Sequence, residues 1–288
     1  MFTIITDSCC DLNPEIANQY ERLEIVPLSY TMSGETHANA LYDTKTVKPY
    51  YDRLRSGEMS TTSQINPAMW QEVFEAHVKK GKQLLCLIFS SALSGTYGAA
   101  CVARDMVLES APDAVIEIVD TLSASAGQGL MVCDALDNRN AGMDIHENAE
   151  WIRAHRQNYV HWFTVDDLHF LKRGGRISGA TAVVGSILQI KPVLHVDNEG
   201  HLINVSKARG RKASIQALAA KVGQTAIEPE KQTMFISHGD CLDDAEYLAN
   251  LVKEQYGVKT VHINHVGPVI GSPSGPGTLA LFFLATER

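Results

Sequence analysis

The sequence predicts an α/β fold whose first half forms a parallel sheet with helices on both faces. Strand and helix patterns alternate there, and the strands at residues 84–89 and 114–119 are apolar almost throughout. Continuous apolar strands are typical of parallel sheets that helices cover on both sides. The second half differs, because Asn198-Glu199-Gly200 joins two short strands as a hairpin. With 288 residues the chain is long enough for one large domain or for two lobes.

Capping signals place the helices of the first half. Asn13-Pro14 and Asn66-Pro67 each combine an N-cap residue with proline at the first helical position. We interpret residues 31–45 as a polar loop and residues 60–64 as a hydroxyl cluster. We expect strands at 2–6, 24–30, 84–89 and 114–119, and helices at 14–20, 47–56, 67–80 and 146–157, with two more after residues 96 and 125.

The second half carries short strands separated by three helices. We expect strands at 160–165, 192–196, 202–205, 233–237, 259–264 and 279–285, and helices at 180–188, 210–222 and 243–256. Residues 267–277, rich in glycine and proline, are expected to form the last loop.

Polar residues follow three strands of the first half where each strand ends. They are Asp7-Ser8, Ser90-Ser91 and Asp120-Thr121, and a helix follows each pair. Ligands of parallel sheets bind beyond the carboxyl ends of the strands, and free N–H groups at a helix start suit a carboxylate or a phosphate. A single turn of this kind is better explained as a plain N-cap. Three of them at one sheet edge favour an anion site.

Composition and charge exclude several classes of protein. The net charge of −8 argues against nucleic acid as the main partner. No run approaches the roughly 18–20 apolar residues of a membrane span, and residues 1–7 resemble a first strand more than a signal peptide. None of the six cysteines has C-x-x-C spacing, so we expect reduced thiols and a cytoplasmic protein. Cys9-Cys10 lies in an expected loop and could be more reactive, although an unreactive pair is the better interpretation.

Known cofactor and nucleophile motifs are missing from the sequence. There is no dinucleotide fingerprint, no Walker A motif and no nucleophile elbow. His262 and His265 lack further ligands nearby, so structural histidines explain them better than a zinc site. We therefore expect neither a metal nor a cofactor. Lys172, Arg173 and Arg176 surround two glycines and could hold an anion, although a solvated basic turn is the alternative.

Short motifs in a fixed order extend over the whole chain. In this respect the chain resembles the DegV family of bacterial fatty-acid-binding proteins, the FakB-type acyl carriers. The matching segments are Thr6-Asp7-Ser8 with Asp11-Leu12, Thr62-Ser63-Gln64 with Pro67, residues 90–97, Asp120 with Ser125, Gly127 and Gly129, Asp167-Leu168, residues 171–177, residues 190–194, residues 267–271 and Gly275-Pro276-Gly277.

The resemblance implies two lobes with one long-chain fatty acid between them. The first lobe, residues 1–158, would be a Rossmann-like αβα sandwich, and the second, residues 159–288, a smaller mixed-sheet α/β domain that completes a lipid tunnel. Thr62 and Ser94 would hold the carboxylate. The ligand-binding residues implied beside these two are Ser63, Gly95, Thr96, Ser125, Ser272 and Ser274.

The resemblance also implies a role without catalysis by this chain. The protein would present the acyl carboxylate to a separate fatty acid kinase catalytic protein, which makes the acyl phosphate for phospholipid synthesis. Arg173 and Arg176 would lie near that contact surface. Exchange of lipid would involve peripheral contact with a membrane.

One position departs from the family pattern. The last loop of the family commonly carries a histidine near the carboxylate, and Pro273 stands at that position here, between Ser272 and Ser274. The head-group contacts must then fall on Thr62, Ser94 and backbone amides, or the two flanking serines must help. His265 is a weaker candidate to replace the missing imidazole.

Two other functions stay open at this stage. One is a hydrolase or transferase of small anions that uses Asp7, Ser94 or His238, although the sequence shows no base beside a nucleophile. The other is a regulatory interaction module that keeps the fold without a useful pocket. Tail length, unsaturation and branching of an acyl ligand depend on the residues that line the tunnel.

Overall fold

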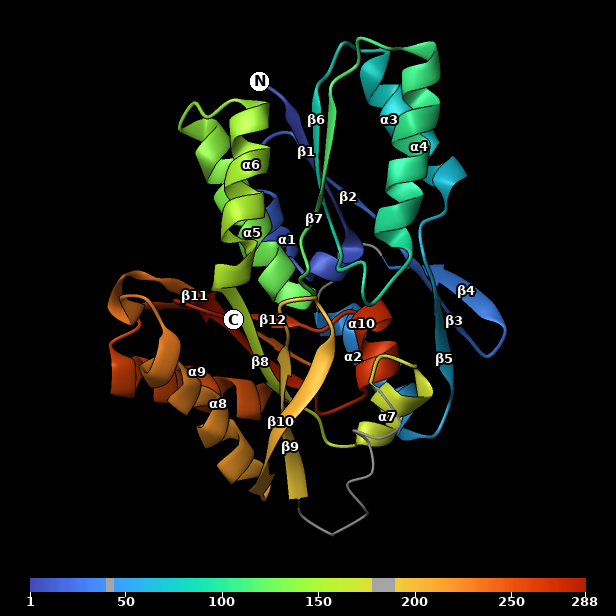
Figure 1. Cartoon of the computed structure of the whole chain (residues 1–288). Coiled ribbons are helices and arrows are strands. Elements are labelled where there is room, and N and C mark those ends of the chain that lie inside the picture. Colours follow the sequence, from blue (N-terminus) through green and yellow to red (C-terminus); the bar gives the residue numbers. More distant parts are fainter. Residues whose placement is uncertain (40–43, 178–189) are drawn as a thin grey trace.

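A four-stranded parallel sheet forms the centre of the first lobe (Figure 1). The structure is a computed structural model, and it describes residues 1–39, 44–177 and 190–288. The strand order is β2-β1-β6-β7, so the chain continues from β1 to β2 on one side and later returns to β6 and β7 on the other side of β1. The bounds are β1 (Thr3–Asp7), β2 (Leu23–Val26), β6 (Leu84–Ile88) and β7 (Ile116–Asp120). The predicted parallel sheet is confirmed.

Helices cover both faces of this sheet, with α3 and α4 on one side and α5 and α6 on the other (Figure 1). Their starts follow from the sequence: the Asn66 side chain accepts from the Met69 N–H, and Asp144 forms a capping box with Glu147. The bounds are η1 (Ser8–Cys10), α1 (Pro14–Ala17), α3 (Pro67–Val78), α4 (Thr96–Ser110), α5 (Ser125–Asn140), α6 (Ile145–His155) and η2 (Arg156–Asn158). The helix expected at 14–20 is only one turn long.

The second lobe is a mixed sheet in the order β10-β9-β8-β13-β11-β12. Only the β11–β12 pair is parallel, and the other neighbours are antiparallel. The bounds are β8 (Tyr159–Thr164), β9 (Ile190–Val196), β10 (Leu202–Arg209), β11 (Thr233–His238), β12 (Thr260–His265) and β13 (Leu279–Leu284), with α8 (Arg211–Thr225), η3 (Pro229–Lys231) and α9 (Leu242–Tyr256) between them. The helix expected at 180–188 lies outside the described residues.

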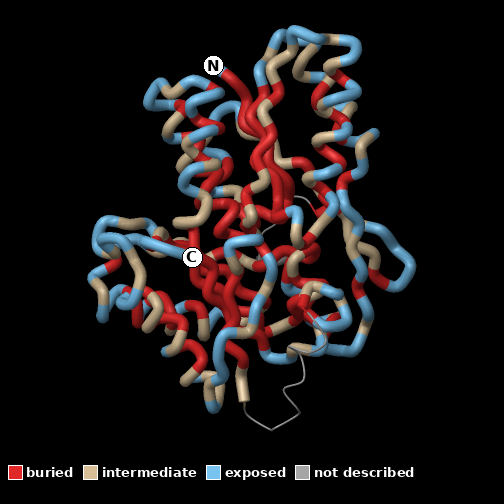
Figure 2. The backbone as a smooth tube through the Cα atoms, in the orientation of Figure 1, coloured by how far each residue is buried: buried red, intermediate tan, exposed pale blue. Residues whose placement is uncertain are grey.

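Helix α5 connects the two lobes through one hydrophobic core. It contacts β1 and β6 of the first sheet and β8, β11 and β13 of the second. Leu130 and Met131 of this helix share a core cluster with Phe163, Phe235 and Phe282. Figure 2 shows buried backbone in both sheets and where the lobes meet. Division of the chain after residue 158 remains a prediction, since one helix serves both cores.

A third, small sheet was not predicted. It has the order β4-β3-β5, with β3 (Ser29–Met32), β4 (Glu35–Ala38) and β5 (Ser60–Ser63) all antiparallel. The interpretation of residues 31–45 as a loop is therefore wrong for β4, and the hydroxyl cluster at 60–64 is mostly a strand. These strands are polar, so the alternation of apolar residues that signals a strand is weak.

Three short helices surround the small sheet. They are α2 (Thr44–Arg55), α7 (Leu168–Arg173) and α10 (Pro268–Ser274). The last of them lies inside the expected loop at 267–277, so that prediction is wrong. Helix α10 begins at Pro268, the favoured first helical position, but its small residues gave no helical stripe.

The cysteines are free thiols, as expected. Cys86 and Cys133 are buried in the core. Cys9 and Cys10 are also buried, and burial raises the pKa of both thiols well above the usual range. Burial therefore argues against the less favoured alternative of a more reactive Cys9-Cys10 pair, because a thiol reacts as its thiolate.

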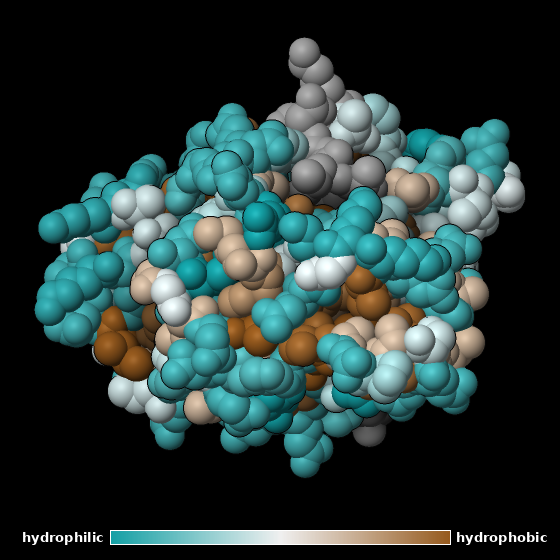
Figure 3. All heavy atoms as spheres, turned by 90° about the horizontal axis from the view of Figure 1, so that it is seen from above, coloured by the Kyte–Doolittle hydropathy of each residue, from teal (hydrophilic) through white to brown (hydrophobic). Residues whose placement is uncertain are grey.

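The molecular surface is mixed in character. Figure 3 shows one face, on which hydrophobic side chains gather in a central band bordered by hydrophilic ones. Large apolar side chains exposed on α3 and α4 include Met69, Val102 and Met106. Among the helices of the described residues, none is long and apolar enough to cross a membrane.

Buried histidines make the stability of this fold depend on pH. Burial lowers the pKa of His195 to about 4 and that of His161 well below its usual value. Both rings are neutral in the folded protein and take up a proton more readily when it unfolds. We predict that these two rings lower the free energy of unfolding as pH drops from about 6.5 toward 4, by roughly 1–3 kcal/mol for His195.

Urea unfolding between pH 7 and pH 4.5 measures this fall. The His195→Gln variant has no titrating ring at this position, so its stability should fall less steeply than that of the unsubstituted protein. Parallel curves for the two proteins would contradict the prediction.

Candidate functional site

The carboxylate of Asp7 lies between β1 and β6, where the strand order of the parallel sheet reverses. It is fully buried and accepts hydrogen bonds from the N–H of Phe89 (2.8 Å), the N–H of Cys9 (3.0 Å) and the side chain of Gln128 (3.3 Å). Burial raises the pKa of Asp7, and the donors act in the opposite direction. Asp7 therefore joins the ends of two strands and starts the turn that follows β6.

The hydroxyl turn after β6 forms hydrogen bonds both within itself and to the second lobe. The Ser90 N–H donates to the Ser123 carbonyl (3.0 Å), and the Ser90 hydroxyl donates to the Gly200 carbonyl of the β9–β10 turn (3.1 Å). The Ser94 hydroxyl pairs with that of Thr96 (2.9 Å) and accepts from the Thr96 N–H (3.3 Å). Ser94 is thus fixed beside the first turn of α4.

Strand β5 faces this turn across an open pocket of about 370 Å³. We call it the hydroxyl pocket; Thr62, Ser63 and Gln64 line it with Ser94 and Gly95. A Cβ atom on Gly95 would lie 2.1 Å from Oε1 of Gln64, so the glycine lets the end of the flexible Gln64 side chain lie directly against this turn. Four of the eight predicted ligand-binding residues therefore share one pocket.

A second, mostly apolar space of about 70 Å³ lies between the lobes. This interlobe cavity is lined by Phe89 and Leu93 from the first lobe and by Phe163, Leu202 and Phe282 from the second, among others. This volume is smaller than the roughly 300–1,000 Å³ of typical small-molecule pockets.

The interlobe cavity and the hydroxyl pocket have a common wall. Residues that line both are Phe89, Leu93, Arg176, Ile270 and Pro273. An apolar cavity therefore adjoins a pocket that carries hydroxyl groups and one guanidinium. Such an arrangement suits a ligand with a long apolar part and an anionic end.

Arg176 occupies the junction of these spaces. Its Nε donates to the Leu93 carbonyl (3.2 Å) and its Nη1 to the Gly174 carbonyl (2.5 Å). It is half-buried, whereas Arg173 is exposed and lies over the Phe170 ring at 4.6 Å. Both arginines line a third space of about 200 Å³, the outer pocket. The sequence predicted Arg176 as a partner contact and offered anion binding by its basic turn as an alternative. Its position in the pocket wall was not predicted.

The remaining predicted serines use their hydroxyls within the protein. Ser125 donates to Asp11 (2.5 Å) and pairs with Ser237 (2.8 Å), and Ser274 donates to the Ile270 carbonyl (2.8 Å). Ser125 and Ser274 line the interlobe cavity.

Ser272 also lies apart from the hydroxyl pocket. Its hydroxyl pairs with Ser60 (2.5 Å) and Tyr50 (3.0 Å), and the residue lines the outer pocket. Pro273 beside it lines all three spaces but has no side-chain donor. The contacts of Ser272 fix α10 against β5 and α2.

Comparison with known proteins agrees with this architecture. The model of the DegV family, described as a family of uncharacterised proteins, matches residues 1–286. The chain belongs to the DegV family.

Two kinds of relative show how closely the chain follows the DegV family. A DegV domain-containing protein from Clostridium perfringens is 44% identical over 287 residues, which cover 100% of this chain and 98% of the relative. Among solved structures, a DegV lipid-binding protein from Thermotoga maritima is similar with a TM-score of 0.88 and 28% identity, and each chain is covered completely. A fatty-acid-binding DegV family protein from Streptococcus agalactiae has a TM-score of 0.85 and 27% identity, over 100% of this chain and 99% of that one.

The residues named for a hydrolase lie apart from one another in this DegV structure. Asp7 is enclosed beneath the strand ends, whereas His238 accepts a hydrogen bond from the Cys241 N–H (3.1 Å) and lies 4.4 Å from the His265 ring. Burial lowers the pKa of His238 to about 4. Among the contacts of the described residues, none joins Ser94 to either of them.

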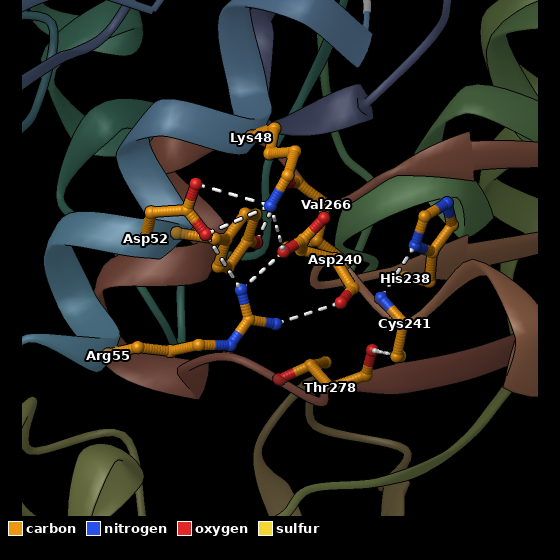
Figure 4. A network of polar contacts seen from close by, with 9 residues as sticks. Lys48, Asp52, Arg55, His238, Asp240, Cys241, Val266 and Thr278 are labelled. Atoms are coloured by element: carbon orange, nitrogen blue, oxygen red, sulfur yellow. Dashed lines mark hydrogen bonds and ion pairs between the residues drawn. The ribbon is translucent and has the colours of Figure 1, made fainter.

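His238 and its neighbours instead belong to a network that attaches α2 to the second lobe (Figure 4). Arg55 donates to the Asp240 carbonyl (2.8 Å) and forms an ion pair with its carboxylate, and Lys48 pairs with Asp52 (3.0 Å). His265 does not line the hydroxyl pocket. The described residues contain no group of three side chains that could hold a metal ion.

Gly127 offers a test of the interlobe cavity. A Cβ atom there would lie 2.4 Å from His161 Nε2 and 2.7 Å from Phe282, and both of these side chains line the cavity. We predict that Gly127→Ala lowers the free energy of unfolding by about 1–3 kcal/mol, the usual effect of overpacking. It should also weaken binding of an apolar fluorescent probe, anilinonaphthalene sulfonate, measured by titration.

Gly98→Ala is the matched control, because a Cβ at this helical glycine meets nothing within 4 Å. Alanine there should leave probe binding unchanged and stabilise the helix slightly. Equal probe binding in both variants would show that the cavity does not take up the probe.

Proposed function

We propose that this protein binds one long-chain fatty acid between its lobes and presents the carboxylate to a separate fatty acid kinase. The observation that carries the proposal is the common wall of an apolar cavity and a pocket with hydroxyl groups. The fatty-acid-binding and lipid-binding relatives support it, since their whole chains share this fold.

Burial of the tail supplies most of the affinity in this proposal. Each buried CH₂ contributes about 0.8 kcal/mol, so a chain of roughly 16 carbons gains far more than its head group can. The head group contributes specificity, because a desolvated carboxylate must keep its hydrogen bonds. Thr62 and Ser94 line the hydroxyl pocket with Arg176 and can donate hydrogen bonds to the carboxylate.

Arg176 fits the departure at position 273. The Pro273 side chain offers no hydrogen-bond donor at the position where the family commonly has histidine. Arg176 and Pro273 both line the hydroxyl pocket. In this proposal the guanidinium provides the positive charge near the carboxylate that an imidazole would otherwise provide. Arg173 stays with the proposed kinase contact, because it is exposed next to the same opening.

We further propose that the protein works in the cytoplasm and exchanges its ligand by peripheral contact with a membrane. The protein then acts as a carrier and not as a catalyst.

The head-group residues can be tested by substitution. We predict that Ser94→Ala and Thr62→Val each weaken palmitate binding by about tenfold, the effect of losing one hydrogen bond to a charged group. Displacement of a fluorescent fatty acid measures affinity, and mass spectrometry of extracted lipid identifies the ligand of the purified protein.

Ser91→Ala is the control for this experiment. Ser91 lies in the same turn but is exposed and does not line the hydroxyl pocket. Absence of any acyl chain, together with no binding of added palmitate, would refute the proposal. Unchanged affinity in both head-group variants would place the carboxylate elsewhere.

The kinase partner has its own test. Palmitate, ATP and a fatty acid kinase catalytic protein should yield acyl phosphate only when this protein is present. We predict that Arg173→Glu raises the concentration of this protein needed for half-maximal rate by about tenfold and leaves palmitate binding unchanged.

Turnover by this chain alone that disappears in Ser94→Ala would support the hydrolase alternative instead.

A further inference from the structure

The β9–β10 turn, residues 197–201, borders the interlobe cavity. Val196 and Leu202, which flank the turn on either side, both line the cavity. Figure 1 shows the turn close to the end of β7, where the second lobe meets the first. The position of the turn therefore helps to set the width of the cavity.

The turn packs closely against the first lobe. The Gly200 carbonyl accepts a hydrogen bond from the Ser90 hydroxyl (3.1 Å). A Cβ atom on Gly200 would lie 2.3 Å from that hydroxyl oxygen and 3.3 Å from the Cα of Leu122, and the φ of Gly200 is +86°. Glycine therefore suits both the backbone conformation and the close contact.

Arg288 connects this turn to other segments of the chain. Its Nη1 donates to the carbonyl of Leu122 (2.7 Å), in the loop after β7, and to that of Asp197 (3.3 Å), in the turn. Its Nη2 donates to the carbonyls of Arg156 (2.8 Å) in η2 and Tyr159 (3.0 Å) at the start of β8. One guanidinium thus joins three segments that are far apart in the sequence.

The bonds of Arg288 come from a charged group. Burial lowers the pKa of Arg288 to about 10, so the side chain stays protonated at neutral pH. Its acceptors are the four carbonyls and the Ser123 hydroxyl (3.4 Å). Hydrogen bonds from an ionised donor are stronger than those between neutral groups, so Arg288 holds the turn firmly.

The cavity behind the turn is too narrow for the proposed ligand. Its volume is about 70 Å³, whereas pockets that hold small molecules measure roughly 300–1,000 Å³. A long acyl tail can enter only if part of the wall moves. Asn198, Glu199 and His201 of the turn are exposed, so the turn can move outward without uncovering these side chains from a core.

We propose that the β9–β10 turn is the movable wall of the interlobe cavity and that Arg288 is the latch that holds it in the narrow position. The inference rests on the proposed function. A ligand with a long tail must open the latch before the tail fits, and the cost of opening reduces the observed affinity. Removal of the latch should therefore tighten the binding of long-tailed ligands, although it removes hydrogen bonds from the folded protein.

Arg288→Gln tests the latch, because glutamine is shorter and uncharged. Affinity is measured by displacement of a fluorescent fatty acid from the delipidated full-length protein. We expect the variant to bind palmitate about tenfold more tightly than the unsubstituted protein, the effect of one hydrogen bond from a charged group. The affinity for octanoate, whose short tail needs less widening of the cavity, should change by less than about twofold.

Arg156→Gln is the matched control. Arg156 is a half-buried arginine beside Arg288, and its side chain donates to the Asp120 carbonyl (2.7 Å) of the first lobe. Among the contacts of the described residues, none joins its side chain to the turn. This variant should change the affinity for palmitate by less than about twofold. Weaker or unchanged palmitate binding in Arg288→Gln, an equal gain for octanoate, or an equal gain in Arg156→Gln would overturn the latch.

A second variant tests the latch if Arg288→Gln does not unfold cooperatively in urea. Gln157→Ala removes the bond from Gln157 Nε2 to the Asn198 carbonyl of the turn (2.8 Å). We expect this variant to bind palmitate about threefold more tightly, the effect of one hydrogen bond between neutral groups. Unchanged affinity would overturn the proposal.

Failure of palmitate to bind any of these proteins would refute the proposed function and not the latch. Titration with anilinonaphthalene sulfonate then decides, because this apolar probe also needs a wider cavity. Tighter binding of the probe by Arg288→Gln than by Arg156→Gln would support the latch, and equal binding would overturn it.

Discussion

The buried carboxylate of Asp7 is the interaction on which the site depends. It accepts the N–H groups that follow β1 and β6, so the two central strands must end side by side. Without it those N–H groups would be buried without partners, at a cost of about 1–3 kcal/mol each. The turn from Ser90 to Ser94 begins at that bond, and with it the common wall of the cavity and the hydroxyl pocket.

The two lobes enclose the candidate site because they share one hydrophobic core. Helix α5 contributes side chains to a core that includes strands of both sheets. Ser90 also bonds to the β9–β10 turn, so the first lobe holds a turn whose neighbour Leu202 lines the cavity. In the proposed function, entry of a long-chain acid would therefore require local opening of packed elements, which favours slow exchange of the ligand.

The small sheet and the three short helices position the polar opening. Hydrogen bonds between the hydroxyl groups of Tyr50, Ser60 and Ser272 hold α2, β5 and α10 together, and Arg55 joins α2 to Asp240 of the second lobe. This explains why several predicted serines have other partners than a ligand. Their hydroxyls stabilise the packing of α2, β5 and α10, whereas Thr62, Ser94 and the two arginines line the polar opening.

The sequence by itself determined the parallel sheet, most helix starts and the hydroxyl turns at strand ends, because apolar periodicity and capping chemistry are local. It also determined the resemblance that led to Thr62 and Ser94. Only the tertiary structure decided the small sheet, whose polar strands leave no periodic signal, and the one-turn helix at Pro14. It alone decided that Arg176 lines all three spaces and that Ser125 bonds to Asp11, since both depend on segments that lie far apart in the chain.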